Sequence, residues 1–501
     1  STGAESQWTG GTNVRFRYGT PEKIGGWTQL GESELTGVAR GLHHFVNTAS
    51  TKFAAIGTNR ILYVYSGGVY YDIHPLVNPL GTAITNAFST TNGSPTVTIT
   101  FSGAHNFQAG DRIAVMMPNM LAYPIIVYGA LKAGIVVVNV NPLYTQRELE
   151  HVLKDSQAKV IVAWEGVANV VEKSNLSNVE KVMITTVGDL LGFKGKIINF
   201  LTRKVKKLVP KFNIDGAIMF NKVLSNNLGK NPVKVDISID NTAFLQYTGG
   251  TTGVSKGAVL SHRNILANII QAFFTIDPKM YDESRNEQRI AICPLPLYHI
   301  FALTVHNFML FHIGGKTVLI TNPRDLKTFV SLMKKHKFHM ISGVNTLYEA
   351  LLNYDGFKEL DFSNLLMSLS GGMAALDTTA KRWHETTKSV IWQAYGLTET
   401  SPLVSVNDYK QTEFTGSVGL PAAFTEIEIR DEDNNVLTET NEVGELCVRG
   451  PQVMSGYWNS EVSGLDENNW FMTGDIARID ETGNIFIVDR KKDMIIVSGF
   501  N

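Results

Sequence analysis

A sixteen-residue run at residues 247–262, YTGGTTGVSKGAVLSH, constrains the fold of this chain more than any other feature. We expect a strand before it, at Phe244–Gln246, and a helix after it, at Asn264–Phe274. Glycines free the backbone to bend sharply and let its N–H groups approach an anion closely. The run contains Gly249, Gly250, Gly253 and Gly257, the hydroxyl residues Thr248, Thr251, Thr252 and Ser255, and the cation Lys256. It predicts a strand–loop–helix unit that binds nucleotide phosphates.

The loop does not match the two most common nucleotide-binding patterns. Lys256 lies between Ser255 and Gly257, not between a glycine and a hydroxyl residue, and no G-x-G-x-x-G run occurs. These departures argue against a Walker P-loop and a Rossmann fingerprint. The alternative, a flexible surface turn, needs only one or two such residues, so a run this long favours a binding loop.

The run resembles the phosphate-binding signature of the AMP-forming, acyl-adenylating enzymes, and it is most similar to that of bacterial long-chain fatty acid–CoA ligases. The resemblance extends from about Gly110 to Asn501. It implies an α/β fold, a large N-terminal adenylation domain with mostly parallel, helix-covered sheets. Apolar runs independently predict such a sheet, because they alternate with helical stretches such as Arg147–Asp155. These runs are Arg112–Met117, Gly134–Val140 and Ala158–Ala163.

Residues 392–400, WQAYGLTET, resemble the second signature of this family. The resemblance places Tyr395 near the adenine between Ala394 and Gly396, gives Thr398 a phosphate contact and makes Glu399 the Mg²⁺ ligand. Carboxylate oxygen suits a hard cation. The alternative for this segment is an ordinary helix start capped near Thr398.

Ser370–Met373 resembles the wall of the adenine pocket, where Gly371 and Gly372 leave room for a flat base. The alternative is a simple strand-to-helix turn.

Met472–Ile476 resembles the ribose site, in which the Asp475 carboxylate accepts hydrogen bonds from two sugar hydroxyls. The alternative is a glycine turn between strands. Residues 489–495 resemble the hinge segment, in which Arg490 reaches the nucleotide and Lys492 is the pivot between two domains. A solvated charged turn is the alternative there.

Residues 294–303 resemble the segment beside the reacting carboxylate and place His299 near it. A lone histidine among apolar residues is equally typical of a protein core.

The resemblance implies two displacements, in which a fatty carboxylate attacks the α-phosphate of ATP and coenzyme A sulfur then takes the acyl group. No protein nucleophile is needed, so catalysis would come from positioning and charge neutralisation. The predicted catalytic residues are Lys256, His299, Thr398 and Glu399. The predicted ATP-binding residues are Thr248, Gly249, Gly250, Thr251, Thr252, Gly253, Gly371, Gly372, Ala394, Tyr395, Gly396, Asp475 and Arg490.

The two ends depart from the family pattern. Residues 1–108 show short alternating runs and hairpin-turn signals, which predict a β-rich segment. They resemble structural tail or virion proteins of bacteriophages. We expect that two unrelated reading frames are joined near residue 110. The part that follows is then an incomplete adenylation domain over 109–491, and residues 492–501 are a hinge with the stub of an absent C-terminal domain. A chain without that domain is expected to be a poor catalyst.

Composition adds weaker constraints. A formal net charge of −1 gives no reason to expect nucleic acid, and Cys293 and Cys447 alone cannot form a disulfide framework, which favours a cytoplasmic location. No signal peptide is predicted at the start, the apolar run 121–131 is too short to span a bilayer, and the histidines form no metal-binding pattern.

Residues 190–214 carry seven Lys and Arg and no acid, which predicts either a solvated face or contact with an anionic membrane.

The first functional hypothesis is a long-chain acyl-CoA ligase that binds ATP, Mg²⁺, a fatty acid and coenzyme A. The alternatives are a virion structural protein with a passenger adenylating fragment, and an adenylating ligase for aryl or medium-chain acids. The loop signatures concern ATP and not the acyl group, so they do not separate the acids. Residues around Gly343–Tyr348 are uncharged and would permit a lipid tail.

Overall fold

The computed structural model describes the backbone of short strands within residues 14–72, and backbone and side chains of 108–228, 235–248, 255–281 and 287–490. The chain divides into two compact units, Ser1–Ala83 and Ile84–Asn501. In the first unit, an antiparallel pair and an antiparallel four-stranded sheet are described. Their strands are β1 (Val14–Arg17), β2 (Thr20–Lys23), β3 (Ala39–Val46), β4 (Lys52–Thr58), β5 (Leu62–Ser66) and β6 (Val69–Asp72). The predicted domain boundary near residue 108 stays a prediction.

The second unit begins, in its described part, with a sheet of order β11-β10-β9-β7-β8-β12-β13. All neighbours are parallel except β12 and β13. Its strands are β7 (Arg112–Met116), β8 (Val136–Val140), β9 (Val160–Trp164), β10 (Lys181–Thr185), β11 (Ile218–Met219), β12 (Thr242–Tyr247) and β13 (Gly257–Ser261). Its helices are α1 (Ala122–Lys132), α2 (Gln146–Ser156), η1 (Glu165–Val167), α3 (Ala168–Lys173), α4 (Gly192–Phe200), η2 (Leu201–Val205) and α5 (Phe220–Asn227).

Helices cover both faces of this first sheet. Val115 belongs to the same core as α1, whereas its neighbour Ala114 belongs to the core under α2 and α3. Successive strand residues face opposite sides, so a strand buried on both faces must be apolar throughout. The continuous apolar runs in the sequence therefore predicted this sheet correctly.

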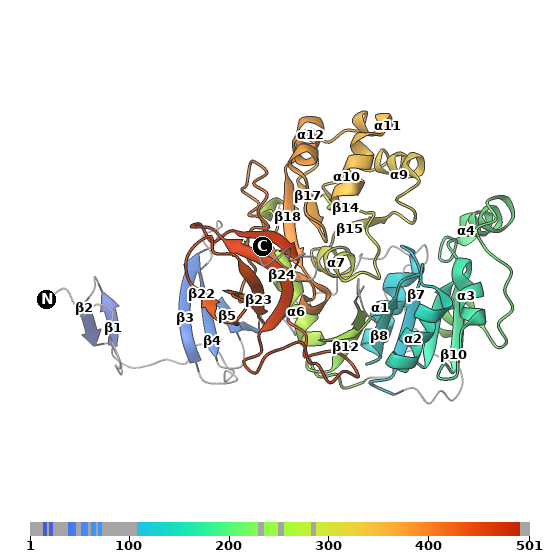
Figure 1. The fold of residues 1–501 in the computed structure, drawn as a ribbon, viewed down its shortest axis with the longest axis horizontal. Helices are drawn as coiled ribbons and strands as arrows, with labels where there is room; N and C mark the ends of the chain where they lie inside the picture. The colour runs from blue at the N-terminus through green and yellow to red at the C-terminus, as the bar shows by residue number, and fades with distance from the viewer. Residues whose placement is uncertain are drawn as a thin grey trace, which may run out of the picture. The chain divides into compact units, whose positions relative to one another are not determined.

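The second sheet has the order β15-β14-β16-β17-β18-β19-β20 and is parallel from β15 to β18. Its strands are β14 (Ile290–Cys293), β15 (Lys316–Leu319), β16 (Met340–Gly343), β17 (Met367–Gly371), β18 (Ile391–Gly396), β19 (Leu403–Val406) and β20 (Leu420–Pro421). The associated helices are α6 (His262–Thr275), η3 (Pro278–Met280), α7 (Ile300–Ala302), η4 (Leu303–Met309), α8 (Leu310–His312), α9 (Leu326–Met333), α10 (Asn345–Leu352), α11 (Asp355–Lys358), α12 (Asp377–Thr387) and η5 (Thr398–Thr400). Figure 1 shows α9, α10 and α12 gathered on one side of this sheet.

The third sheet is antiparallel and has the order β22-β21-β23-β24-β25. Its strands are β21 (Glu426–Arg430), β22 (Val436–Leu437), β23 (Gly444–Arg449), β24 (Phe471–Ile479) and β25 (Ile485–Arg490). One continuous core joins all three sheets, since Phe244, Leu369 and Leu446 belong to the same buried cluster. The described residues of the second unit therefore form one packed body. Among the described residues, no helix combines the length and apolar character needed to cross a membrane.

Candidate active site

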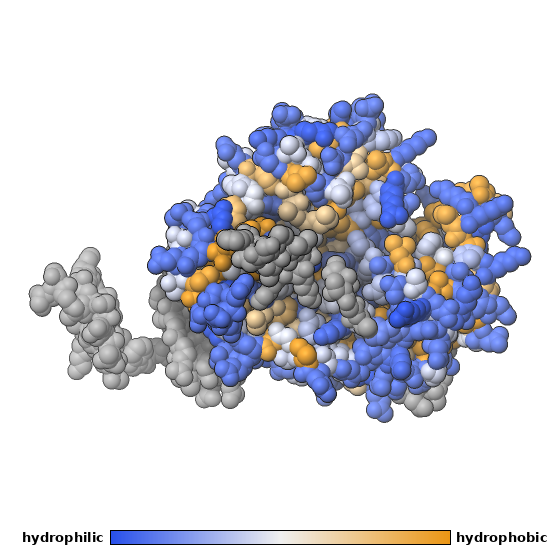
Figure 2. All heavy atoms as spheres, in the orientation of Figure 1, coloured by the Kyte–Doolittle hydropathy of each residue, from blue (hydrophilic) through white to orange (hydrophobic). Residues whose placement is uncertain are grey.

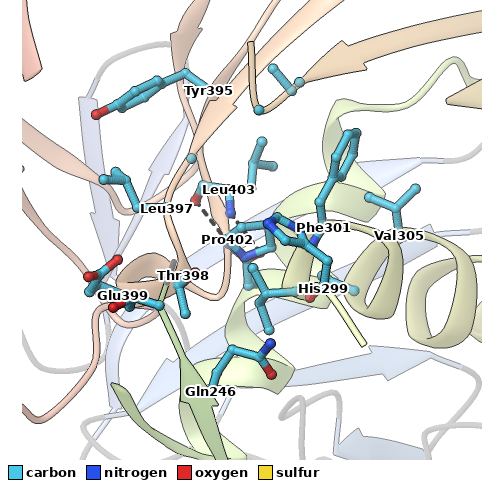
Figure 3. Close-up of a pocket in the computed structure, with 18 of the residues that line it drawn as sticks. Gln246, His299, Phe301, Val305, Tyr395, Leu397, Thr398, Glu399, Pro402 and Leu403 are labelled. Atoms are coloured by element: carbon cyan, nitrogen blue, oxygen red, sulfur yellow. Dashed lines mark hydrogen bonds between the residues drawn. The ribbon is translucent and has the colours of Figure 1, made fainter. Parts of the chain in front are cut away.

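A cavity of about 1000 Å³ lies where the three sheets of the second unit meet. Its lining comes from the end of β12, from β18 and η5, from β24 and β25, and from α6 and η4. The volume is in the range of pockets that enclose a small-molecule ligand. Figure 3 shows Thr398 and Glu399 on one side of it and His299, Phe301 and Val305 on the other.

The predicted phosphate loop connects β12 to β13 as a hairpin. Thr248 N–H donates to the Lys256 carbonyl oxygen at 3.0 Å, which closes the base of the loop. His151 Nε2 lies 2.8 Å from the Ser255 carbonyl oxygen, so α2 holds the returning strand. Both Thr248 and Lys256 line the cavity. Gly249, Gly250, Thr251, Thr252 and Gly253 lie outside the described residues, and their role stays a prediction.

Sequence reasoning missed one element of this unit. The residues 257–261, GAVLS, form β13 and pair with β12 before the helix begins. Ser261 and Asn264 then make a capping box that starts α6. The predicted strand and helix are both present, but a second strand separates the loop from the helix.

Glu399 and Lys256 meet around a tyrosine that the sequence did not single out. The Tyr457 hydroxyl donates to Glu399 Oε1 at 2.6 Å, and Lys256 Nζ lies 5.2 Å from the centroid of the same ring. Glu399 is 9% exposed. Burial, and then the neighbouring Glu399 carboxylate, raise the pKa of Tyr457, so the phenol stays a proton donor. The site thus brings the buried Glu399 carboxyl group and the Lys256 side chain to the same tyrosine ring, next to the predicted phosphate loop.

This arrangement fits a magnesium–phosphate complex. No group of three His, Cys, Asp or Glu side chains is placed to bind a metal in the described ranges. Mg²⁺ is usually held by only one or two carboxylates together with substrate phosphates, so a single carboxylate beside the loop is a suitable donor set. Thr398 lines the cavity next to Glu399 and adds a hydroxyl.

Three predicted nucleotide-binding residues come together although they are far apart in the sequence. The Tyr395 hydroxyl donates to Asp475 Oδ2 at 2.6 Å, and Arg490 Nε lies 3.0 Å from Asp475 Oδ1. Asp475 is 3% exposed, while the Arg490 side chain is 59% exposed. Burial, and then the Asp475 carboxylate, raise the pKa of Tyr395. The Asp475 carboxylate is thus fixed in the cavity wall with lone pairs that can accept from a ligand.

A second acidic side chain fixes the turn that carries Asp475. Gly474, at φ +73°, donates its N–H to Glu445 Oε1 at 3.0 Å. Glu445 lines the cavity and was not predicted. No local pattern marks it, because its partner lies 29 residues away on the adjacent strand.

The predicted glycine wall lies along β17 and β18. Gly371 pairs with Ala394, and a Cβ at Gly371 would come within 3.1 Å of the Ala394 oxygen and of the Phe301 ring. A Cβ at Gly396 would lie 2.1 Å from the Pro402 oxygen. Gly372, at φ +77°, also lines the cavity. Protein atoms therefore occupy the place of a side chain at Gly371 and Gly396, whereas Gly372 has open space where a Cβ would lie.

His299 is exposed to the cavity, so it is not a core histidine. Its ring is still surrounded by protein, and this enclosure lowers the pKa of His299. Its Nδ1 accepts from the Phe301 N–H at 3.3 Å, which makes His299 the cap of α7. The neutral ring is therefore oriented by its own helix.

The inner end of the cavity is mainly apolar. Its lining residues from α6, from Ile276 just after that helix, from η4 and from β19 are Asn268, Ala272, Thr275, Ile276, Thr304, Val305, Met309, Leu403 and Val406. Gly343–Tyr348, which we expected beside a lipid tail, does not line it. The Tyr348 side chain is fully buried in a different core, and its hydroxyl donates to the Leu369 carbonyl oxygen at 2.7 Å. That expectation was wrong, because α10 covers the opposite face of the second sheet.

Comparisons with known proteins show which proteins this chain is similar to. A family model described as AMP-binding enzyme matches residues 101–458. The long-chain-fatty-acid–CoA ligase of Escherichia coli O157:H7 is 48% identical over 396 residues, 78% of this chain and 70% of that protein. Its counterpart from Haemophilus influenzae is 48% identical over 398 residues, with 79% and 70% covered.

Among solved structures, the anthranilate CoA ligase AuaEII, in complex with anthranoyl-AMP, superimposes with a TM-score of 0.67 at 20% identity. The match covers 79% of this chain and 71% of that one. At this identity the likeness concerns the fold alone. It confirms the predicted α/β fold of adenylating enzymes.

Proposed function

We propose that this chain, which belongs to the family of AMP-binding enzymes, joins a long-chain fatty acid to coenzyme A through an acyl-AMP intermediate formed from ATP. It is an AMP-forming acid–thiol ligase. One observation carries the proposal: a single cavity combines a polar end, with Lys256, Glu399 and Asp475, and an apolar end between α6 and η4.

In the first step, a carboxylate oxygen of the fatty acid forms a bond to the α-phosphorus of ATP, and the bond to pyrophosphate breaks. Asp475 would accept from the ribose hydroxyls, and Gly371 with Tyr395 would flank the adenine. Lys256 and the loop N–H groups would neutralise phosphate charge as it shifts towards pyrophosphate. Mg²⁺ held by Glu399 would add to this neutralisation.

In the second step, the coenzyme A thiol loses its proton to solvent, its sulfur bonds to the acyl carbon, and AMP leaves with the carboxylate oxygen. Adenylation has already supplied a good leaving group, so no side chain needs to act as a nucleophile. His299 lines the same cavity, and its neutral imidazole would orient the reacting carboxylate.

The apolar end supports a long acyl chain. Each methylene that leaves water for such a lining contributes about 0.8 kcal/mol to binding. Ile276, Val305 and Met309 offer hydrocarbon to the chain, and Thr275 and Thr304 carry no charge. An aryl or medium-chain acid would fill less of this space and gain less.

The deciding experiment is ATP–pyrophosphate exchange measured with a series of acids. We expect exchange to depend on an added acid, to be greatest with palmitate and weaker with octanoate and benzoate, and to fall strongly in Glu399→Gln. If exchange is greatest with benzoate, the substrate is an aryl acid, and if it is greatest with octanoate, the substrate is a medium-chain acid. Either result would contradict the assignment of a long-chain substrate. No exchange and no calorimetric ATP binding by a folded preparation would contradict the proposal altogether.

We further propose that the protein works in the cytoplasm with peripheral contact to a membrane, where fatty acids partition. ATP and coenzyme A then arrive from the water side and the acid from the lipid side. No feature of the described residues supports a nucleic acid partner.

A further inference from the structure

The helix formed by α4 and η2 exposes large apolar side chains to water. Figure 1 places α4 at the edge of the second unit, and Figure 2 shows hydrophobic side chains there, bordered by hydrophilic ones. The exposed residues, called the α4 surface below, are Leu190 (39% exposed), Leu191 (38%), Phe193 (76%), Ile197 (48%), Phe200 (60%), Leu201 (43%), Val205 (62%) and Leu208 (55%). Within the helix, Phe193, Ile197 and Leu201 follow one another at intervals of four residues, and Phe200 is three residues after Ile197, so these side chains lie on one side.

The opposite side of the helix carries small or polar residues, and it packs against the rest of the protein. Asn199 accepts from the Gly188 N–H and donates to Thr186 Oγ1, both at 2.8 Å. Gly195 packs so closely on Gly188 that a Cβ on either would lie about 2 Å from the other's oxygen (1.9 and 2.1 Å). Thr202 is 8% exposed.

This arrangement is the reverse of an ordinary surface helix, which buries its apolar stripe. The polar contacts hold the helix in place, and the apolar side chains are left outside. A contiguous exposed apolar surface of this kind is typical of an interaction site.

Positive charges surround the α4 surface. Lys194, Lys196, Lys204, Lys206, Lys207 and Lys211 are exposed, and no acidic residue occurs between 190 and 214. Arg203 is tied inward, with its guanidinium 2.6 Å from the buried Glu165 carboxylate. The pairing anchors the helix without cancelling the lysine charges.

We infer that the α4 surface docks on an anionic lipid bilayer, with its apolar side chains in the headgroup region and its lysines on lipid phosphates. An apolar side combined with a cationic rim is complementary to such a surface. A second copy of the chain would bring two cationic surfaces together.

Docking would place the ligase where its acid substrate is concentrated. This benefit rests on the proposed function, but the docking itself does not. Binding to vesicles can therefore be measured separately from ligase activity, and failure of one leaves the other standing.

The test is co-sedimentation of the full chain with vesicles of phosphatidylcholine alone or with a third of phosphatidylglycerol, at low and high salt. We expect binding to the anionic vesicles that weakens as salt screens the charges. Each lysine at an anionic surface strengthens binding about fivefold, so Lys204→Glu with Lys207→Glu should weaken it by at least roughly 25-fold, because the new carboxylates also repel the lipid phosphates. Phe193→Ser with Phe200→Ser should also weaken binding.

The matched controls are Lys335→Glu with Lys337→Glu, exposed lysines near α9, and Phe424→Ser, an exposed aromatic at 87%. These should bind vesicles like the parent chain. Exchange activity in solution without vesicles should be the same in all variants, which shows that they fold. Equal binding to both vesicle types, or equal loss in the control variants, would overturn the inference. Light scattering that shows a dimer abolished by the phenylalanine changes, without vesicle binding, would assign the surface to self-association instead.

Discussion

At the scale of single residues, the site depends on hydrogen bonds that orient charged side chains before a ligand arrives. Asp475 contacts Tyr395 and Arg490, and Glu399 contacts Tyr457. Such preorganisation places charge where, on the proposed function, phosphates and sugar hydroxyls would bind. Two predictions follow from these contacts.

Replacing Tyr457 by phenylalanine should weaken the use of magnesium. The variant keeps the ring beneath Lys256 but removes the hydroxyl that orients the Glu399 carboxylate. A hydrogen bond to a charged group contributes about 1.5–3 kcal/mol, so the Mg²⁺ concentration at half-maximal exchange should rise roughly tenfold. Calorimetric titration of Mg·ATP should show the same loss of affinity, while the dependence on palmitate should not change. Unchanged magnesium dependence would show that Tyr457 only packs.

Replacing Asp475 by asparagine should remove recognition of the ribose. The parent protein should bind ATP at least roughly tenfold more tightly than 2′,3′-dideoxy-ATP, because a buried acceptor is left unpaired by the analogue. The Asp475→Asn variant should bind both nucleotides weakly and with little difference. If the variant still prefers ATP by the parent's factor, Asp475 does not contact the sugar.

At the scale of elements, the joint between β18 and β19 shapes the nucleotide wall. Gly396 lies at the end of β18, and its Cα faces the Pro402 carbonyl at the start of β19. The joint carries Thr398 and Glu399 in η5 between these two strands. Its tight closure is what brings both side chains into the cavity.

The variant Gly396→Ala should therefore lose more stability than Gly372→Ala, in which the added methyl group strains the backbone but meets no other atom. A Cβ there would overlap the Pro402 oxygen at 2.1 Å, and we expect a loss of about 3 kcal/mol in the free energy of unfolding. Gly372→Ala is the comparison, because Gly372 has φ +77° but open space around it, and it should lose only about 1 kcal/mol. Urea unfolding measures both. Equal losses would mean that the joint can open to admit a side chain.

At the scale of the whole molecule, one core joins the three sheets, and it contains buried ionisable groups. His306 in η4 is 2% exposed, and its Nε2 lies 2.5 Å from Ser342 Oγ. Burial lowers the pKa of His306 to about 3. The unfolded chain therefore binds a proton near pH 6.5 that the folded protein does not accept.

This difference makes stability fall as the pH is lowered. Between pH 7 and pH 5, His306 alone should remove about 2 kcal/mol from the free energy of unfolding, since the unfolded state takes up the extra proton. Urea unfolding of the parent and of His306→Gln at both pH values measures this contribution. The variant's loss should be smaller than the parent's by that amount. The same pH dependence in both proteins would contradict the assignment to His306.

The sequence by itself determined the local units. Glycines, hydroxyls and lysine within one run marked the phosphate loop, and apolar runs alternating with amphipathic stretches predicted the parallel sheets, because both depend on neighbouring residues. It also identified Glu399, Asp475 and Arg490 as site residues, although their roles stay predictions.

Tertiary structure alone decided which distant side chains meet. Tyr457 reaches Glu399 across 58 residues, and the apolar part of the cavity lies against α6 and η4 and not against α10. It also decided that the helix at α4 turns its apolar side outward. These outcomes depend on how sheets pack against one another, and packing is a balance of contacts between segments that no local pattern contains.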